Sequence, residues 1–421
     1  MTGLQKFLKQ RPLVRHLLVS LSGTLVAQLI LLAAQPLLRR LYAPEHFGEL
    51  SLYLSLTGVL ATVAPFRYEL ALMIPASQDK ALKIFWGATL LNTFFSLCIT
   101  LLALLAAEPL IDLMRLPSTA TLWLPWVGPS VWLYGMFMLF QNLFSRNQSY
   151  QRVNALRIGR RIPEIIFQWG AAGRLNLGLV AGEIAGRISM TALGFYFLLK
   201  SHPGSIHLLR NARKWLLPLL AFRQYPLRSF FPTFLNALAL LAPSLIVNYH
   251  FGSYANGLFD MCLQVLALPA GFVINAISNV LLAEISQRHR QSRPLFGFLK
   301  RTATGLMGLA LLMALGIALL GTSGFQFLFG SEYGLSYAYA IWLIPAIGSR
   351  LVVAPLAVFF AGTHQIGRSV WWQYTYAAGI LTFFIIPFVH IHQFLAAYAC
   401  FEVILNVLYL WQIFWLAKKS N

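Results

Sequence analysis

Long hydrophobic runs, separated by short polar stretches, dominate the pattern along this chain of 421 residues. A membrane-spanning helix needs about 20 mostly apolar residues, and twelve stretches of the sequence meet that requirement. The predicted spans cover residues 15–38, 48–75, 84–107, 120–144, 156–173, 176–199, 229–250, 255–283, 302–321, 335–362, 369–389 and 393–416. The pattern therefore predicts an all-α polytopic membrane protein with twelve transmembrane helices.

The composition excludes a water-soluble globule. Hydrophobic residues make up 58% of the chain, charged residues only 10%, and the mean hydropathy is +0.68, whereas soluble domains carry about 25% charged residues. The net charge of +20 does not indicate nucleic-acid binding, because this composition cannot supply a solvated basic surface. The three Cys residues all lie in apolar runs, so we expect neither a disulfide framework nor a metal site or cofactor.

The Lys and Arg residues predict the orientation of the spans, because cytoplasmic loops are enriched in them. Twenty-five of the 32 cations fall on the side that holds both termini, and four fall on the opposite side. We therefore expect both termini in the cytoplasm. The external loops are too short to form a folded catalytic domain, and no nucleophile motif appears, so we expect no enzyme and no catalytic residue.

The spans divide into two sets of six. The longest predicted cytoplasmic connection lies at the middle of the chain, so we expect two six-helix bundles, over residues 1–205 and 206–421, around a central cavity. A weak internal repeat agrees with this division, since the turn that contains Gly48 matches the turn that contains Gly257.

Charged residues inside the spans are the candidate functional residues. Each costs about 2.5 to 3.5 kcal/mol on insertion scales, so they normally face a bundle interior or a wet cavity. Glu183 and Arg187 are four residues apart and can pair on one helix face. Arg67 and Glu69 would point about 200° apart around a continuous helix, and we place Arg67 in the cavity.

Small residues predict one close helix contact. Gly178, Gly182 and Gly186 recur at a spacing of four, and such a face lets another helix approach closely. We expect this face to serve packing rather than ligand binding.

Several short motifs resemble the bacterial oligosaccharide flippases. These form the polysaccharide transporter family within the multidrug, oligosaccharidyl-lipid and polysaccharide exporter superfamily. Residues 67–75 (RYELALMIP) look like the signature at the end of the family's second helix, and residues 41–48 (LYAPEHFG) are similar to its preceding turn. Residues 257–259 (GLF), 269–270 (PA) and 284–286 (EIS) look like its eighth helix.

The resemblance implies a flippase that moves undecaprenyl-pyrophosphate-linked oligosaccharide, such as an O-antigen repeat unit of lipopolysaccharide, from the cytoplasmic to the periplasmic leaflet of the bacterial inner membrane. Alternating access and coupling to H⁺ or Na⁺ are expected, with membrane lipids, a polysaccharide polymerase and a chain-length regulator as partners. The cavity cations that would neutralise the diphosphate are Arg67, Arg187, Arg350 and Arg161. The acids that would pair with them or carry the coupling ion are Glu69, Glu164, Glu183, Asp260 and Glu402.

Two alternatives remain open. A multidrug antiporter that exports cations would share the architecture, although the buried arginines favour an anionic ligand. A polysaccharide polymerase or ligase resembles this chain in helix number but carries a large external loop with catalytic residues, which this sequence lacks.

Overall fold

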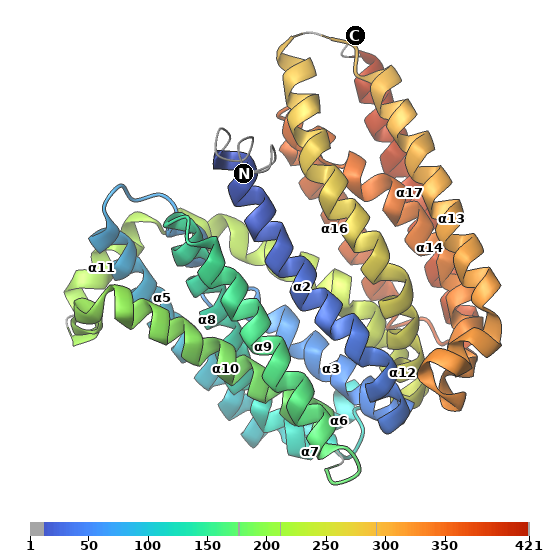
Figure 1. The fold of residues 1–421 in the computed structure, drawn as a ribbon, viewed down its shortest axis with the longest axis horizontal. Helices are drawn as coiled ribbons and strands as arrows, with labels where there is room; N and C mark the ends of the chain where they lie inside the picture. The colour runs from blue at the N-terminus through green and yellow to red at the C-terminus, as the bar shows by residue number, and fades with distance from the viewer. Residues whose placement is uncertain (1–11, 176, 211, 292, 420–421) are drawn as a thin grey trace, which may run out of the picture. The chain divides into compact units, whose positions relative to one another are not determined.

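The computed structural model describes residues 12–175, 177–210, 212–291 and 293–419, and within these ranges the regular elements are all helices (Figure 1). The helices of the first half are α2 (Pro12–Leu41), α3 (Pro44–Ala61), α4 (Tyr68–Ala71), α5 (Gln78–Leu105), α6 (Ala107–Met114), α7 (Ala120–Trp123), α8 (Val127–Arg146), α9 (Tyr150–Ala171), α10 (Gly178–Ser201) and α11 (Ala212–Ala221). The later helices are α12 (Gln224–Arg290), α13 (Phe296–Phe329), α14 (Leu335–Leu356), α15 (Phe359–Gly362), α16 (Ile366–Thr382) and α17 (Ile391–Lys419). Short 3₁₀ helices are η1 (Leu124–Trp126), η2 (Pro203–Arg210) and η3 (Ser331–Gly334).

The helices form two compact units. Unit 1 contains the described residues up to Tyr42 together with Leu52–Leu241, and unit 2 contains Ala43–Ser51 together with the described residues from Ala242 onward. Both α3 and α12 therefore contribute residues to each unit. The division into domains at residues 205 and 206 stays a prediction.

Each of the twelve predicted segments overlaps a helix of the described chain. Five helical segments there are long and apolar enough to cross a membrane, and they are Gln78–Leu105, Gln224–Arg290, Phe296–Phe329, Ser331–Gly362 and Ile391–Lys419. The count of twelve spans and the cytoplasmic termini stay predictions, and the predicted cytoplasmic cations at positions 6, 9 and 11 lie outside the described residues.

Helix α5 shows the surface expected of a membrane protein. Beyond the first turn its exposed side chains are apolar, with Leu97 57% and Leu101 56% exposed. Its buried side includes polar residues, and the fully buried Asn92 donates from Nδ2 to the backbone oxygen of Trp132 at 3.0 Å. An apolar exterior around polar interior contacts fits a helix whose surroundings are lipid.

In unit 1, α9 and α10 lie side by side along the predicted small-residue face (Figure 1). A Cβ atom at Gly182 would lie 2.9 Å from the backbone oxygen of Glu164, and one at Gly186 would lie 2.6 Å from that of Arg160. The predicted close approach of another helix to these glycines is therefore confirmed, and that helix is α9.

In unit 2, the first turns of α3 cross α12 at backbone distance. A Cβ atom at Gly48 would lie 1.9 Å from the backbone oxygen of Ser253, and one at Gly257 would lie 1.8 Å from that of Pro44. Asn256 Nδ2 also donates to the backbone oxygen of Gly48 at 2.9 Å. The two glycines matched by the internal repeat thus meet at one helix crossing.

This crossing predicts that Gly48→Ala and Gly257→Ala will destabilise the protein. The added methyl group must displace backbone atoms, and overpacking of this kind costs about 1–3 kcal/mol. Thermal unfolding followed by size-exclusion chromatography in detergent should show a lower midpoint for both variants. Gly271→Ala is the control, because Gly271 lies on α12 like Gly257 but no heavy atom lies within 4 Å of the new Cβ. It should match the parent protein.

Candidate functional site

Helix α3 ends before the residues that carry the flippase-like motif. Ala61 is its last residue, and the chain then turns, with Phe66 N bonded to Val63 O at 2.8 Å and Tyr68 N bonded to Pro65 O at 3.1 Å. Phe66 and Arg67 both adopt left-handed backbone conformations, with φ of 52° and 63°. Such strain costs about 1–3 kcal/mol per residue and often accompanies functional sites.

The break changes the predicted geometry of Arg67 and Glu69. Arg67 Nη1 lies 2.8 Å from Glu69 Oε1, so the two side chains form an ion pair. The expectation that they point to opposite sides was wrong, because it assumed a continuous helix across residues 48–75. The Glu69 side chain is 1% exposed, and within the described ranges Arg67 is the one charged side chain that pairs with it.

A second group of charges links α9 to α10 within unit 1. Arg161 Nη1 donates to both oxygens of Glu164 at 2.8 Å. Arg160 lies 3.7 Å from Glu164 and donates to Glu183 Oε1 at 2.5 Å. Arg187 Nε donates to the same Glu183 oxygen at 2.6 Å. The order Arg161, Glu164, Arg160, Glu183, Arg187 defines what we call the ion-pair chain, in which three guanidinium groups accompany two carboxylates.

The two ends of the ion-pair chain differ in accessibility. Arg187 is 3% exposed, and its remaining nitrogens donate to Ser130 O and Thr57 Oγ1, both at 3.2 Å. Arg161 is 21% exposed. The predicted pairing of Glu183 with Arg187 is confirmed, and the more accessible cation lies at the Arg161 end.

Unit 2 contains a separate charged group on α14, α16 and α17, which we call the Arg350 cluster. Arg350 Nη2 pairs with Glu402 Oε1 and donates to Tyr376 Oη at 3.2 Å and Tyr398 Oη at 3.4 Å. Tyr376 Oη donates to Glu402 Oε1 at 2.5 Å, and Asn406 Nδ2 lies 3.4 Å from Glu402 Oε2. Glu402 is buried, whereas 30% of the Arg350 side chain is exposed.

Asp260 lies on α12 in unit 2. Its carboxylate Oδ2 accepts a hydrogen bond from Gln264 Nε2 at 3.0 Å. In the part of the chain that the structure describes, no set of three or more His, Cys, Asp and Glu side chains has the arrangement of a metal site.

Partly exposed arginine side chains of this kind can bind an anion. Arginine presents a planar fork of N–H donors that matches phosphate oxygens. The buried carboxylates already neutralise most of the positive charge, which keeps the free-energy cost of burial tolerable. Partly exposed guanidinium groups at Arg161 and Arg350 can therefore exchange or extend their bonds toward a ligand.

Comparison with known proteins identifies the family of this chain. Residues 37–337 match a family model described as "Polysaccharide biosynthesis protein", which covers more than half of the sequence. The chain belongs to this family. It is also 22% identical over 353 residues to "Succinoglycan biosynthesis transport protein ExoT" of Rhizobium meliloti (strain 1021). That alignment covers 80% of this chain and 66% of the relative, slightly under two thirds of its length.

Solved transporters share the fold. An inward-facing multidrug resistance MATE family transporter of the MOP superfamily has a TM-score of 0.74 at 12% identity, with 96% of this chain and 98% of the transporter covered. The lipid II flippase MurJ in an inward closed conformation has a TM-score of 0.71 at 14% identity, with 95% and 87% covered. This member of the polysaccharide biosynthesis family is therefore a multi-pass membrane protein with a MATE-like and MurJ-like fold.

The structure adds buried or partly buried polar residues that sequence reasoning missed. Arg160 connects both carboxylates of the ion-pair chain, and its spacing of four from Glu164 was a usable signal. Arg39, predicted to lie in an external loop, is 2% exposed in the last turn of α2, where Nε donates to Gln35 Oε1 at 3.1 Å. Glu49 is buried in the first turns of α3.

The difference between the two ends of the ion-pair chain predicts unequal effects on stability. Arg187→Gln breaks a fully buried pair and should lower the free energy of unfolding by up to about 3–5 kcal/mol. Arg161→Gln should have a much smaller effect, because water reaches Arg161 and Arg160 remains near Glu164. Thermal unfolding of both variants in detergent measures this, and equal losses would contradict the assignment of Arg187 as a packing contact.

Proposed function

We propose that this protein is a lipid-linked oligosaccharide flippase. It moves undecaprenyl-pyrophosphate-linked repeat units from the cytoplasmic to the periplasmic leaflet of the bacterial inner membrane by alternating access. Membership of the polysaccharide biosynthesis family, a relative named for succinoglycan transport and the MurJ-like fold support this proposal. The polymerase and chain-length regulator of the same pathway class are its proposed protein partners.

The excess of cations in the ion-pair chain is the observation that supports a negatively charged substrate. Three guanidinium groups face two carboxylates, so one positive charge lacks a counter-charge within that chain. A diphosphate would supply it at the accessible Arg161 end. We propose Arg67, Arg187, Arg350 and Arg161 as substrate-binding cations, with Arg161 in direct contact and Arg187 holding the ion-pair chain together.

The MATE-like fold also favours a second candidate, a multidrug antiporter. Such a protein would bind cationic drugs, for which a surplus of guanidinium groups is unfavourable. The three buried acids of the two charged groups are each held by arginine. We therefore place the flippase first.

Arg161 gives the first test of the flippase. Deleting the gene should cause an undecaprenyl-linked saccharide to accumulate inside the cell, and the parent gene should reverse this. Arg161→Gln should restore export about tenfold less well or worse, because a bond to a charged group contributes about 1.5–3 kcal/mol. Arg161→Lys should restore it in part, since it keeps the charge without the fork.

The control is Arg174→Gln, which removes an exposed cation from the segment between α9 and α10. It should export normally, with protein levels compared in every strain. A deletion strain with no accumulated lipid-linked saccharide, but with raised sensitivity to cationic drugs, would contradict the flippase and favour the antiporter.

Glu69 is the proposed site of ion coupling among the candidate acids, which are Glu69, Glu164, Glu183, Asp260 and Glu402. Its carboxylate is buried and its recorded pairing is with Arg67 alone, whereas Glu164, Glu183 and Glu402 each have two or more partners. A carboxylate with a single partner is the least costly of these to protonate or to pair with Na⁺.

Glu69→Gln should therefore abolish the dependence of transport on an ion gradient. Uptake of a lipid-linked saccharide into proteoliposomes, measured with and without a proton or sodium gradient, reports this dependence. Glu45→Gln, at an exposed position in the first turn of α3, should behave like the parent protein. Full gradient dependence in Glu69→Gln would assign coupling to another acid.

A further inference from the structure

A groove with two cations in its wall lies in unit 2, between the start of α16 and the end of α17. Its volume is about 570 Å³, within the range of small-molecule sites, about 300–1,000 Å³. We call it the α16–α17 groove, and its lining residues are Gln365, Gly367, Arg368, Trp371, Leu416 and Lys419.

Aromatic side chains explain why space remains between these two helix ends. Trp372 on α16 stacks on Tyr409 of α17 with ring centroids 4.6 Å apart, and Tyr376 contacts Phe401 at 5.7 Å. Rings of this size hold the two backbones apart. Beyond them, at the start of α16, Gly367 has no side chain to fill the gap, and a Cβ atom there would meet no heavy atom within 4 Å.

The groove lies at the depth where lipid headgroups are expected. Helix α17 is long and apolar enough to cross a membrane, and Lys419 lies in its last turn. Trp371 is 74% exposed and Trp415 is 44% exposed, and tryptophan is enriched where spans meet the membrane surface. Lys419 Nζ lies 3.8 Å from the centre of the Trp415 ring, a cation–π contact that holds the ammonium group at this level.

The charges around the groove favour a ligand with net negative charge. Arg368 and Lys419 are exposed, and none of the lining residues is acidic. Within the described ranges, neither cation forms an ion pair with a carboxylate. An arginine fork and a lysine ammonium group both bind phosphate oxygens. A zwitterionic headgroup would also bring an ammonium group, for which this groove offers no carboxylate.

We propose that the α16–α17 groove binds the headgroup of an anionic phospholipid, whose phosphate oxygens accept hydrogen bonds from Arg368 and Lys419. Basic pockets between membrane helices are suited to such headgroups. The exposed indole of Trp371 favours a phosphate that carries acyl chains over a soluble phosphate ion. This site is separate from the proposed transport function.

The proposed lipid would join two helices that meet again in the Arg350 cluster. Arg368 lies on α16 and Lys419 on α17, so a phosphate held by both bridges the helix ends. The same two helices supply Tyr376 and Glu402, which are hydrogen-bonded to each other in the cluster. Lipid binding therefore favours the arrangement of α16 and α17 in which that hydrogen bond forms.

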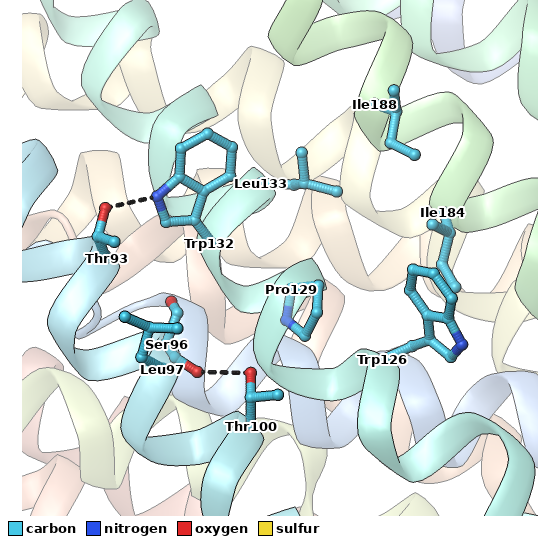
Figure 2. Close-up of a pocket in the computed structure, with 10 residues that line it drawn as sticks. All are labelled: Thr93, Ser96, Leu97, Thr100, Trp126, Pro129, Trp132, Leu133, Ile184 and Ile188. Atoms are coloured by element: carbon cyan, nitrogen blue, oxygen red, sulfur yellow. Dashed lines mark hydrogen bonds between the residues drawn. The ribbon is translucent and has the colours of Figure 1, made fainter.

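A groove in unit 1, between α5, α8 and α10, provides a contrast (Figure 2). Its volume is about 420 Å³, and none of its lining residues is charged. Trp132 Nε1, in its wall, donates to Thr93 Oγ1 at 2.8 Å. Without a cation, this groove has no means of preferring an anionic headgroup over a zwitterionic one.

Native mass spectrometry in detergent tests the proposal. The protein is titrated with dioleoyl phosphatidylglycerol or dioleoyl phosphatidylethanolamine, and the first bound lipid is counted. The anionic lipid should bind about tenfold more tightly, and the double variant Arg368→Gln, Lys419→Gln should lose that preference. The control Lys300→Gln, Arg301→Gln removes the same charge from exposed positions in the first turns of α13 and should keep the preference.

Gly367→Leu gives a second test that keeps both cations. Its side chain enters the groove without meeting protein atoms, so it should weaken binding of phosphatidylglycerol about tenfold without lowering the midpoint of thermal unfolding. Gly297→Leu, at the second residue of α13 and equally free of contacts, should bind like the parent protein. Leu97→Trp, in the uncharged groove of unit 1, should also keep the preference.

Several outcomes would overturn the assignment. Equal binding of the two lipids by the parent protein would reduce the site to ordinary surrounding lipid, and an equal loss in the α13 double variant would indicate attraction to net charge alone. Displacement of phosphatidylglycerol by inorganic phosphate would assign the groove to a soluble ion. Preferential displacement by undecaprenyl pyrophosphate would assign it to the transported lipid. The export test at Arg161 does not depend on this binding, so either proposal can fail alone.

Discussion

A charged side chain in hydrocarbon must be neutralised by its neighbours, and this requirement organises both units. An unpaired ion in such surroundings costs several kcal/mol, so the buried carboxylates Glu164, Glu183 and Glu402 each contact arginine. In unit 1 the pairing requires α9 and α10 to approach closely, and Gly182 and Gly186 permit that approach. Small residues and ion pairs are thus two parts of one arrangement.

The two charged groups satisfy this requirement differently. The ion-pair chain alternates cations and anions and ends on a cation at both ends. The Arg350 cluster is balanced in charge and adds the hydroxyl groups of Tyr376 and Tyr398. A tyrosine hydroxyl can donate to the carboxylate and accept from the guanidinium without adding charge. The side chains of the ion-pair chain therefore carry one net positive charge, whereas those of the Arg350 cluster are neutral together.

Sequence reasoning reached those features that depend on local spacing. The helical character of the spans, the Glu183–Arg187 pair and the small-residue face of α10 all follow from hydropathy or from a repeat of four residues. It failed where the backbone departs from a helix. Arg67 pairs with Glu69 because Phe66 and Arg67 take left-handed conformations. Pro65, just before them, is a signal for a break in the helix, but it does not define the backbone angles of the two residues that follow.

Local sequence patterns also could not predict contacts between segments that are distant in the sequence. Arg160 on α9 pairs with Glu183 on the neighbouring helix α10. Arg39 is buried in the last turn of α2, where its sequence surroundings resemble a cationic loop. The spacing of residues along one helix defines which side chains share its face, but it does not identify the neighbouring helix. The motifs that resemble the flippase family indicated candidate residues, whereas the pairing of their side chains depends on how the helices pack.

The crossing of Gly48 and Asn256 has a consequence for biosynthesis. The hydrogen bond between them joins positions separated by 208 residues, so the first turns of α3 leave the ribosome long before their partner on α12 exists. Until then this polar backbone segment lacks its native packing. A chain interrupted before α12 would therefore leave the backbone oxygen of Gly48 without this partner.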